Sequence, residues 1–120
     1  MRDGSAACAV TAVNLGETLD VLTRHMGWPV HEVEEKLRWL MLGGLAVIDV
    51  NDTIGLEAGR LHAGHYHRTR RPLSFADCVA LAAALIRSEP LATSDPAIVS
   101  TATDIGCAVI RLPDARGHRP

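Results

Sequence analysis

The chain has 120 residues, of which 48% are apolar, and its formal net charge is −2 at pH 7. This length and composition are typical of one globular domain with a real core, and they exclude a disordered chain. The slightly acidic balance argues against a protein that coats nucleic acids through its overall charge, but it leaves room for a local basic patch. No apolar stretch approaches the roughly 20 residues of a membrane-spanning helix, so we expect no membrane partner. A single domain is predicted over residues 1–112, followed by a flexible tail over 113–120, where glycine, proline and charges gather.

The three cysteines, Cys8, Cys78 and Cys107, show no C-x-x-C spacing, and each lies in an apolar stretch. We therefore expect reduced, buried thiols in a cytoplasmic protein. Residues 1–5 lead straight into a strand-like run, without the long apolar segment of a signal peptide.

The first part of the chain predicts a strand and two helices. Residues 7–13 form a β-prone apolar run, and Asn14 is the expected N-cap of a helix that ends at Gly27. Pro29 opens the next helix, and the glycine pair at 43–44 ends it. The residues expected on the inner face of that second helix are Val33, Leu37, Leu40 and Met41.

The rest of the chain alternates strands with helices. A strand over 45–49 is followed by a helix that Asp52 caps and by a polar loop over 62–71. The apolar residues expected inside that helix are Ile54, Ala58 and Leu61. Beyond the loop, the pattern predicts a helix, a strand, a helix and a strand, over 74–87, 90–93, 96–105 and 107–112. This order predicts an α/β fold with a parallel sheet, and right-handed crossovers place helices on both of its faces.

Three carboxylates, Glu17, Asp77 and Asp95, are expected where strands end or helices begin. In a parallel α/β sheet these ends share the edge at which such folds bind ligands. Carboxylates so close together repel one another unless a cation neutralises them, and Mg²⁺ prefers such hard oxygen ligands. Thr93 and Ser94 add hydroxyls beside Asp95 that could orient a water, or could serve only in a turn. The set predicts a divalent-metal site.

Each of these acids, taken alone, also has a purely structural explanation. Asn14 with Glu17, and Ser74 with Asp77, match the spacing of a capping box. Asp95 followed by proline matches an N-cap with proline at the first helical position. Each cap is worth about 0.5–2 kcal/mol of helix stability, so both explanations stay open at this point.

Three segments resemble, in order and spacing, motifs of the PIN-domain ribonucleases, and most of all the VapC-type toxins of bacterial toxin–antitoxin pairs. The segments are Thr11-Ala-Val-Asn-Leu-Gly-Glu17, Leu73-Ser-Phe-Ala-Asp77-Cys-Val-Ala-Leu-Ala and Leu91-Ala-Thr-Ser-Asp95. The resemblance spans about residues 7–112 and implies a PIN-like fold, RNA as substrate and a Mg²⁺- or Mn²⁺-dependent endoribonuclease. Its catalytic, metal-binding acids would be Glu17, Asp77 and Asp95, and Thr93 would match the family's hydroxyl position. An antitoxin that occupies the active site is the partner it implies.

The resemblance also predicts a part that this chain does not contain. The family's pattern begins with a strand that carries an aspartate, and then a helix, ahead of the strand at 7–13. Asp3 precedes that strand and does not replace the missing acid, and residues 2–5 look like the turn that leads out of the missing helix. We therefore expect a PIN-like fold that is N-terminally truncated relative to the family. It would be either a chain starting at an internal methionine, the favoured explanation, or an inactive remnant that only binds an antitoxin or dimerises.

Two further patterns have simpler explanations. His62, His65 and His67 could suggest zinc, but no Cys or acid at a usual spacing completes four ligands, so a solvated helix end is expected. A phosphate-receiver domain needs a lysine near the sheet edge, and Lys36, the only lysine, falls within a predicted helix.

Basic and aromatic residues suggest where partners could bind. Three arginines lie just before the helix that carries Asp77, and they are either a solvated loop or a phosphate-binding group for RNA: Arg68, Arg70 and Arg71. Trp28 and Trp39 flank the second helix, where core or interface packing is the expected role. In the family that the chain resembles, this region commonly serves dimer or antitoxin contacts, so we expect a homodimer or an antitoxin contact there.

Overall fold

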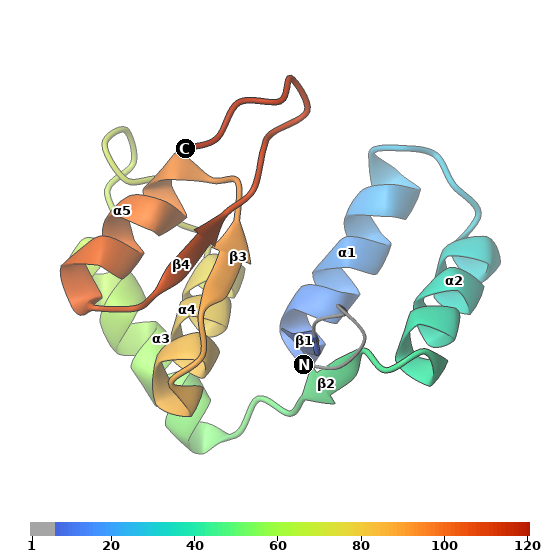
Figure 1. Cartoon of the computed structure of the whole chain (residues 1–120), viewed down its shortest axis with the longest axis horizontal. Helices are drawn as coiled ribbons and strands as arrows, with labels where there is room; N and C mark the ends of the chain where they lie inside the picture. The colour runs from blue at the N-terminus through green and yellow to red at the C-terminus, as the bar shows by residue number, and fades with distance from the viewer. Residues whose placement is uncertain (1–6) are drawn as a thin grey trace. The chain divides into compact units, whose positions relative to one another are not determined.

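The structure, a computed structural model, describes residues 7–120 and is of mixed α/β type (Figure 1). Its contacts divide the chain into two compact units, which meet in the sequence between Asp49 and Val50. Asp3 and the turn expected over residues 2–5 lie outside the described residues. The N-terminal unit holds β1 (Ala9–Thr11), α1 (Ala12–Arg24), α2 (Val30–Leu42) and β2 (Ala46–Ile48). The C-terminal unit holds α3 (Asp52–His65), α4 (Phe75–Arg87), β3 (Leu91–Thr93), α5 (Pro96–Ile105) and β4 (Val109–Arg111).

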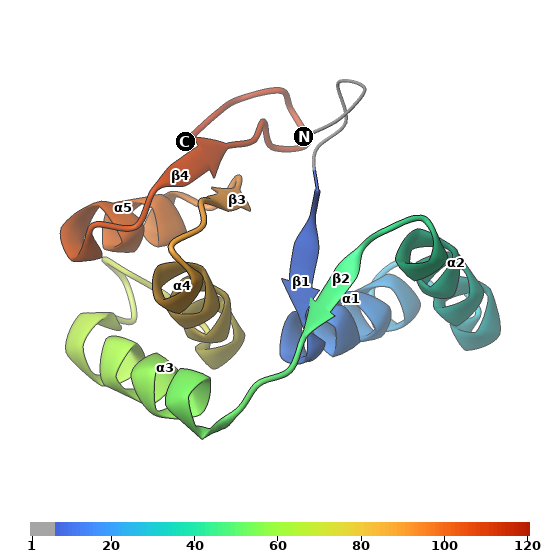
Figure 2. The same ribbon diagram turned by 60° about the horizontal axis from the view of Figure 1, so that its bottom comes forward.

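In the N-terminal unit two short parallel strands are connected by a pair of helices. Val10 of β1 lies opposite Val47 of β2, and both strands point the same way in Figure 2. Helix α1 packs against both strands and against α2. Parallel strands need a crossover connection of this kind, because a tight hairpin can join only antiparallel ones.

The start of α1 differs from the prediction. The helix begins at Ala12, its N-cap is Thr11, and the Thr11 hydroxyl accepts a hydrogen bond from the Asn14 amide at 3.0 Å. The expected cap at Asn14 is therefore wrong, and β1 ends at Thr11 because that residue turns the chain into the helix. Glu17 then lies in the second turn of α1, beyond the position that a capping box requires.

The inner face of α2 is only partly as predicted. Val33 is buried, Leu37 and Met41 are half-buried, but Leu40 is 57% exposed. Periodicity identifies the side of a helix that is apolar, and a unit this small has too little chain to cover that side along its whole length. Trp39, 67% exposed, adds to the apolar surface that this end of α2 presents.

The C-terminal unit contains most of the buried core. Helix α4 contacts α3 on one side and β3 and α5 on the other, as Figures 1 and 2 both show. Alanines in the middle of α4 let the neighbouring elements approach closely, and β3 pairs parallel to β4 with Ala92 opposite Ile110. The most deeply buried side chains of this unit include Leu73, Cys78, Val79, Leu81, Ala82 and Thr101.

Helix α3 starts one residue earlier than predicted and ends well beyond its predicted end. Its N-cap is Asn51, whose side chain accepts from the Ile54 amide at 2.9 Å, so the expected cap at Asp52 is off by one residue. The buried apolar residues are the predicted ones, Ile54, Ala58 and Leu61. The helix continues to His65, into the segment predicted as a loop. Histidines in the last turn suit the negative end of the helix dipole, which helps to explain why so polar a segment stays helical.

The predicted α/β class, with parallel strand pairing, is confirmed. In the part of the chain that the structure describes, the parallel strands form two pairs, β1 with β2 and β3 with β4, rather than one continuous sheet. None of the helices among these residues is long and apolar enough to cross a membrane. The predicted domain limits, 1–112 with a flexible tail over 113–120, stay a prediction.

Candidate active site

Asp77 is fixed at the start of α4 by a reciprocal pair of hydrogen bonds. The Ser74 amide donates to Asp77 Oδ2 at 2.8 Å, and the Asp77 amide donates to Ser74 Oγ at 3.0 Å. This is the predicted capping box, and the positive end of the helix dipole favours a carboxylate at this position. The half-buried carboxylate is therefore held in one orientation through one of its two oxygens.

Asp95 is fixed at the start of α5 in a similar way. Its Oδ1 accepts from the Ala97 amide at 2.8 Å, and Pro96 occupies the first helical position. The Asp95 amide donates to Thr93 Oγ1 at 3.0 Å, and Thr93 is buried at the end of β3. The Thr93 hydroxyl thus fixes the backbone that carries Asp95, while Ser94 is exposed.

Asp77 and Asp95 belong to the same unit. The path of the chain in this unit brings Asp95 back toward the end at which Asp77 lies. In Figure 1, α4 and β3 run in opposite directions. The 13 residues of α4 rise by about 20 Å, and the segment from Glu89 to Asp95, which includes β3, can cover about the same length. The end of β3 therefore comes back to the end of the unit at which α4 begins.

The donor set suits a hard divalent cation. Within residues 7–120, Asp77 Oδ1 and Asp95 Oδ2 make no hydrogen bond, because each helix cap uses only the other oxygen of its carboxylate. Free carboxylate oxygens are the ligands that Mg²⁺ prefers. No group of three or more His, Cys, Asp or Glu side chains able to hold a metal ion occurs among the described residues. Glu17 belongs to the N-terminal unit, so its membership of the site stays a prediction.

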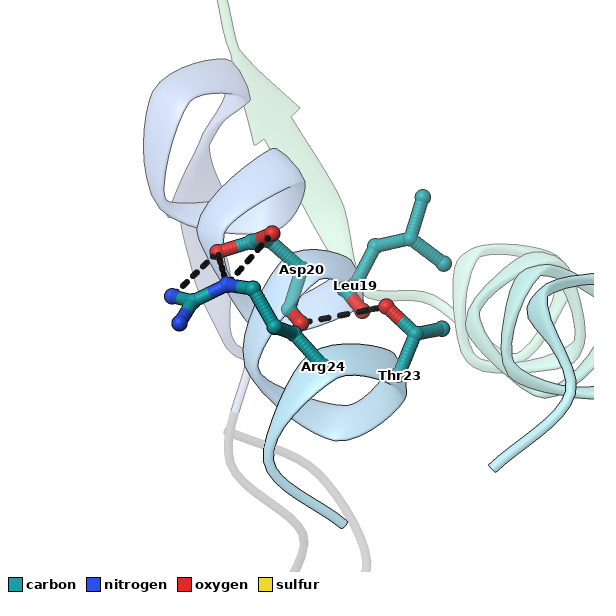
Figure 3. Close-up of polar contacts among 4 residues, drawn as sticks. All are labelled: Leu19, Asp20, Thr23 and Arg24. Carbon is teal, nitrogen blue, oxygen red and sulfur yellow. Dashed lines mark hydrogen bonds and ion pairs between the residues drawn. The ribbon is translucent and has the colours of Figure 1, made fainter. Parts of the chain in front are cut away.

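Glu17 and Asp20 are the two acids of α1, and their surroundings differ. Asp20 forms an exposed ion pair with Arg24, with 2.9 Å between Asp20 Oδ2 and the guanidinium NH2, and Thr23 Oγ1 donates to the carbonyls of Leu19 and Asp20 (Figure 3). The hydrogen bond from Arg24 lowers the pKa of Asp20 and raises the pKa of Arg24. Glu17 is exposed and, among the described residues, forms no ion pair. Of the two acids, Glu17 is therefore the one whose carboxylate is available to a cation.

The three predicted RNA-binding arginines have different surroundings. Arg68 and Arg70 are exposed on a short turn that the paired backbone of His67 and Arg71 closes. The Arg71 guanidinium donates to Ser100 Oγ at 2.6 Å, lies 2.8 Å from Asp104 Oδ2 and contacts His65 Nδ1 at 3.1 Å. Arg71 therefore ties the end of α3 to α5, while Arg68 and Arg70 point their charge into solvent.

The three histidines of this segment make separate contacts. His67 Nδ1 accepts from the Thr69 and Arg70 amides, so that nitrogen is used in the turn. His65 contacts Arg71, and His62 stacks on Tyr66. These contacts agree with the expected polar helix end.

The thiol beside Asp77 is buried and protonated. Burial, and to a smaller extent the charge of Asp77, raises the pKa of Cys78 to about 11. Burial also raises the pKa of Cys107. A neutral thiol is a poor nucleophile and a poor metal ligand, so we assign Cys78 to the core rather than to the candidate site. Cys8 is exposed, against the expectation that all three thiols are buried.

The family model described as "PIN domain" matches residues 2–104, which is most of the chain. The chain belongs to the PIN domain family. PIN domains are generally nucleases that act on RNA or DNA and typically use divalent metals such as Mg²⁺. No curated protein matches the chain.

Proposed function

We propose that this chain is a metal-dependent endoribonuclease that cleaves RNA phosphodiesters, and that it acts as the toxin of a toxin–antitoxin pair. The observation that carries the proposal is the pair of aspartates, Asp77 and Asp95. Each is fixed by one carboxylate oxygen in a helix cap and keeps its other oxygen available. Membership of a family of nucleases supports the reaction type.

Each residue has a distinct role in this proposal. Asp77, Asp95 and Glu17 would hold Mg²⁺, or Mn²⁺ in its place. When bound, the metal supplies positive charge against the phosphate oxygens and makes water a stronger nucleophile. Thr93 positions Asp95 through the hydrogen bond that its hydroxyl accepts, and Arg68 and Arg70 attract the RNA backbone. Arg71, with its guanidinium engaged by α5, would act mainly by holding the turn in place.

The toxin role and the partners rest on the resemblance and on an apolar surface. Trp39, Leu40 and Leu42 are all more than half exposed at the end of α2, and apolar side chains gathered in this way are typical of a protein contact. An antitoxin or a second copy of the chain is the partner that this surface fits. A cytoplasmic location agrees with a toxin that cleaves cellular RNA.

The experiment that tests the reaction uses two forms of one RNA, a circle and an end-labelled linear strand. The whole chain is incubated with each in Mg²⁺, in Mn²⁺ and in excess EDTA. We expect the circle to be linearised and internal fragments to appear with either metal, and neither to appear in EDTA. A circle left intact in both metals would overturn the proposal, and cleavage that persists in EDTA would overturn its metal dependence.

The alternative is a PIN remnant without activity that only binds an antitoxin or dimerises. The observation that favours it is that no group of three potential metal ligands occurs within residues 7–120. The two functions differ in metal binding, because a functional site is stabilised by Mg²⁺ and a remnant is not. A protein that forms a stable dimer but gains no heat stability from Mg²⁺ would support the remnant.

A further inference from the structure

Three rings line up on the surface where α3 meets α4, and we call them the ring row: Tyr66, His62 and Phe75. The rings of His62 and Tyr66 are stacked, with centroids 4.8 Å apart and planes 17° from parallel. The rings of His62 and Phe75 are tilted by 51°, with centroids 6.1 Å apart. The approach of Phe75 to His62 depends on the packing of α4 on α3, so the row does not show as a local pattern in the sequence.

The ring row is held by regular structure but is not buried. His62 and Tyr66 are four residues apart at the end of α3, a spacing that brings side chains together on one face of a helix. Phe75 is the first residue of α4, which packs against α3. Tyr66 is 46% exposed and Phe75 is 51% exposed, so both ends of the row keep ring surface in contact with solvent.

Positive charge lies next to one end of the row. The chain leaves Tyr66 and enters the turn that the backbone of His67 and Arg71 closes, with the two amide–carbonyl hydrogen bonds at 2.9 and 3.0 Å. Arg68 and Arg70 are exposed on this turn, and neither forms a salt bridge within the described part of the chain. A fixed turn therefore carries two cations immediately after an exposed ring.

The candidate catalytic carboxylate belongs to the same helix start as the last ring of the row. Asp77 is two residues beyond Phe75 in the first turn of α4, a rise of about 3 Å along the helix, and the two side chains leave the helix on different faces, because residues two apart do not face each other. The surface of the ring row therefore combines rings and cations, and the carboxylate lies at the same end of α4. A nucleotide strand has the complementary parts, because its phosphates pair with arginine and its bases stack on aromatic rings.

We propose that the ring row, with Arg68 and Arg70, is a stacking site for an unpaired base of single-stranded RNA, at the end of the C-terminal unit where α4 begins. The inference rests on the proposed function for the choice of RNA. In a duplex the faces of the bases are hidden by their neighbours, so a stacking site of this kind selects single-stranded or looped segments. The ring row then selects which segments of RNA the chain binds.

The test measures binding without cleavage. The probe is a 10-nucleotide RNA with one 2-aminopurine, whose fluorescence is quenched on stacking, mixed with the whole chain in EDTA. We expect Phe75→Leu and Tyr66→Leu each to weaken binding of the single strand about 5-fold or more and to remove quenching, as expected for loss of one base–ring stack. Phe75→Tyr, which keeps a ring, should bind like the unaltered chain. Arg68→Ala should weaken binding and lower its salt dependence instead.

Leu56→Ala is the matched control, because Leu56 is an exposed apolar residue on α3 outside the ring row. Circular dichroism melts of each variant separate loss of binding from loss of fold. Unchanged affinity and quenching in folded Phe75→Leu, or equal affinity for the duplex form of the probe, would overturn the inference. A chain that stacks the base but leaves circular RNA intact in Mg²⁺ would overturn only the proposed cleavage.

Discussion

Ser74 and Asp77 bind each other twice: the Ser74 amide donates to Asp77 Oδ2 at 2.8 Å, and the Asp77 amide donates to Ser74 Oγ at 3.0 Å. The carboxylate thus caps α4 with one oxygen and keeps the other available. The Asp77 side chain therefore combines a capping role with the proposed role of a metal ligand. A substitution of Ser74, its capping partner, can separate these two roles.

Ser74→Ala should lower the free energy of unfolding by about 0.5–2 kcal/mol, because the Asp77 amide loses its acceptor at the helix start. RNA cleavage should persist, since the backbone amide of residue 74 still donates to Asp77. Urea unfolding followed by circular dichroism at 222 nm measures the stability. Ser74→Thr keeps a capping hydroxyl and should restore most of the loss; equal stability of all three proteins would contradict the capping role.

Arg71→Met should destabilise the C-terminal unit by about 1–2 kcal/mol, because it removes hydrogen bonds from a mostly buried guanidinium to Ser100 and Asp104. Amide hydrogen exchange in peptides from α5 should speed up. Arg68→Met removes an exposed side chain of the same type from the same turn and is the matched control. Equal exchange in the two variants would show that Arg71 does not tie α3 to α5.

Burial raises the pKa of Cys78 to about 11, from an ordinary value of 9.0. The folded state therefore holds this proton more tightly than the unfolded state, so stability should be unaffected below pH 9 and fall as pH rises from 9 toward 11. The full loss attributable to this thiol is about 2–3 kcal/mol. Urea midpoints at pH 7, 9 and 10.5 measure it, and Cys78→Ala should show a shallower decline. Parallel declines in both proteins would contradict this role for Cys78.

Mg²⁺ should raise the melting temperature of the unaltered chain, with about 2.7 kcal/mol of stabilisation when its concentration is 100 times the dissociation constant. Asp95→Asn should reduce this gain, because the amide replaces a charged oxygen ligand. Asparagine is as good an N-cap as aspartate, so the variant should melt normally without metal. Differential scanning calorimetry with and without Mg²⁺ measures both. A full Mg²⁺ gain in Asp95→Asn would remove Asp95 from the proposed site.

Local signals in the sequence predicted the helix caps of the C-terminal unit well. The Ser74 and Asp77 capping box and the helix Pro96–Ile105 were predicted as the structure has them, because both depend on residues within one turn of each other. The start of α1 was missed because Thr11 and Asn14 are both good caps three residues apart, and the pattern alone did not favour Thr11. Leu40 was misplaced because the pattern shows which side of a helix is apolar but not where a neighbour covers it.

Contacts between segments that are far apart in the chain could not be predicted from the sequence. The stacking of His62 on Tyr66 follows a helical spacing and could have been anticipated, but the approach of Phe75 requires the packing of α4 on α3. Arg71 and Arg68 belong to the same run of basic residues, so the sequence does not distinguish their roles. Only the fold shows that Ser100 and Asp104 contact the Arg71 guanidinium.

The most direct test of the central proposal is the rate at which Asp77→Asn cleaves RNA in Mg²⁺. The asparagine side-chain oxygen can still accept from the Ser74 amide, so the variant should fold and melt like the unaltered chain. We predict that its cleavage rate falls by at least about 10- to 100-fold, the loss typical even of groups that only support a metal ligand. A folded Asp77→Asn protein that cleaves RNA at the unaltered rate would contradict a catalytic site at this carboxylate.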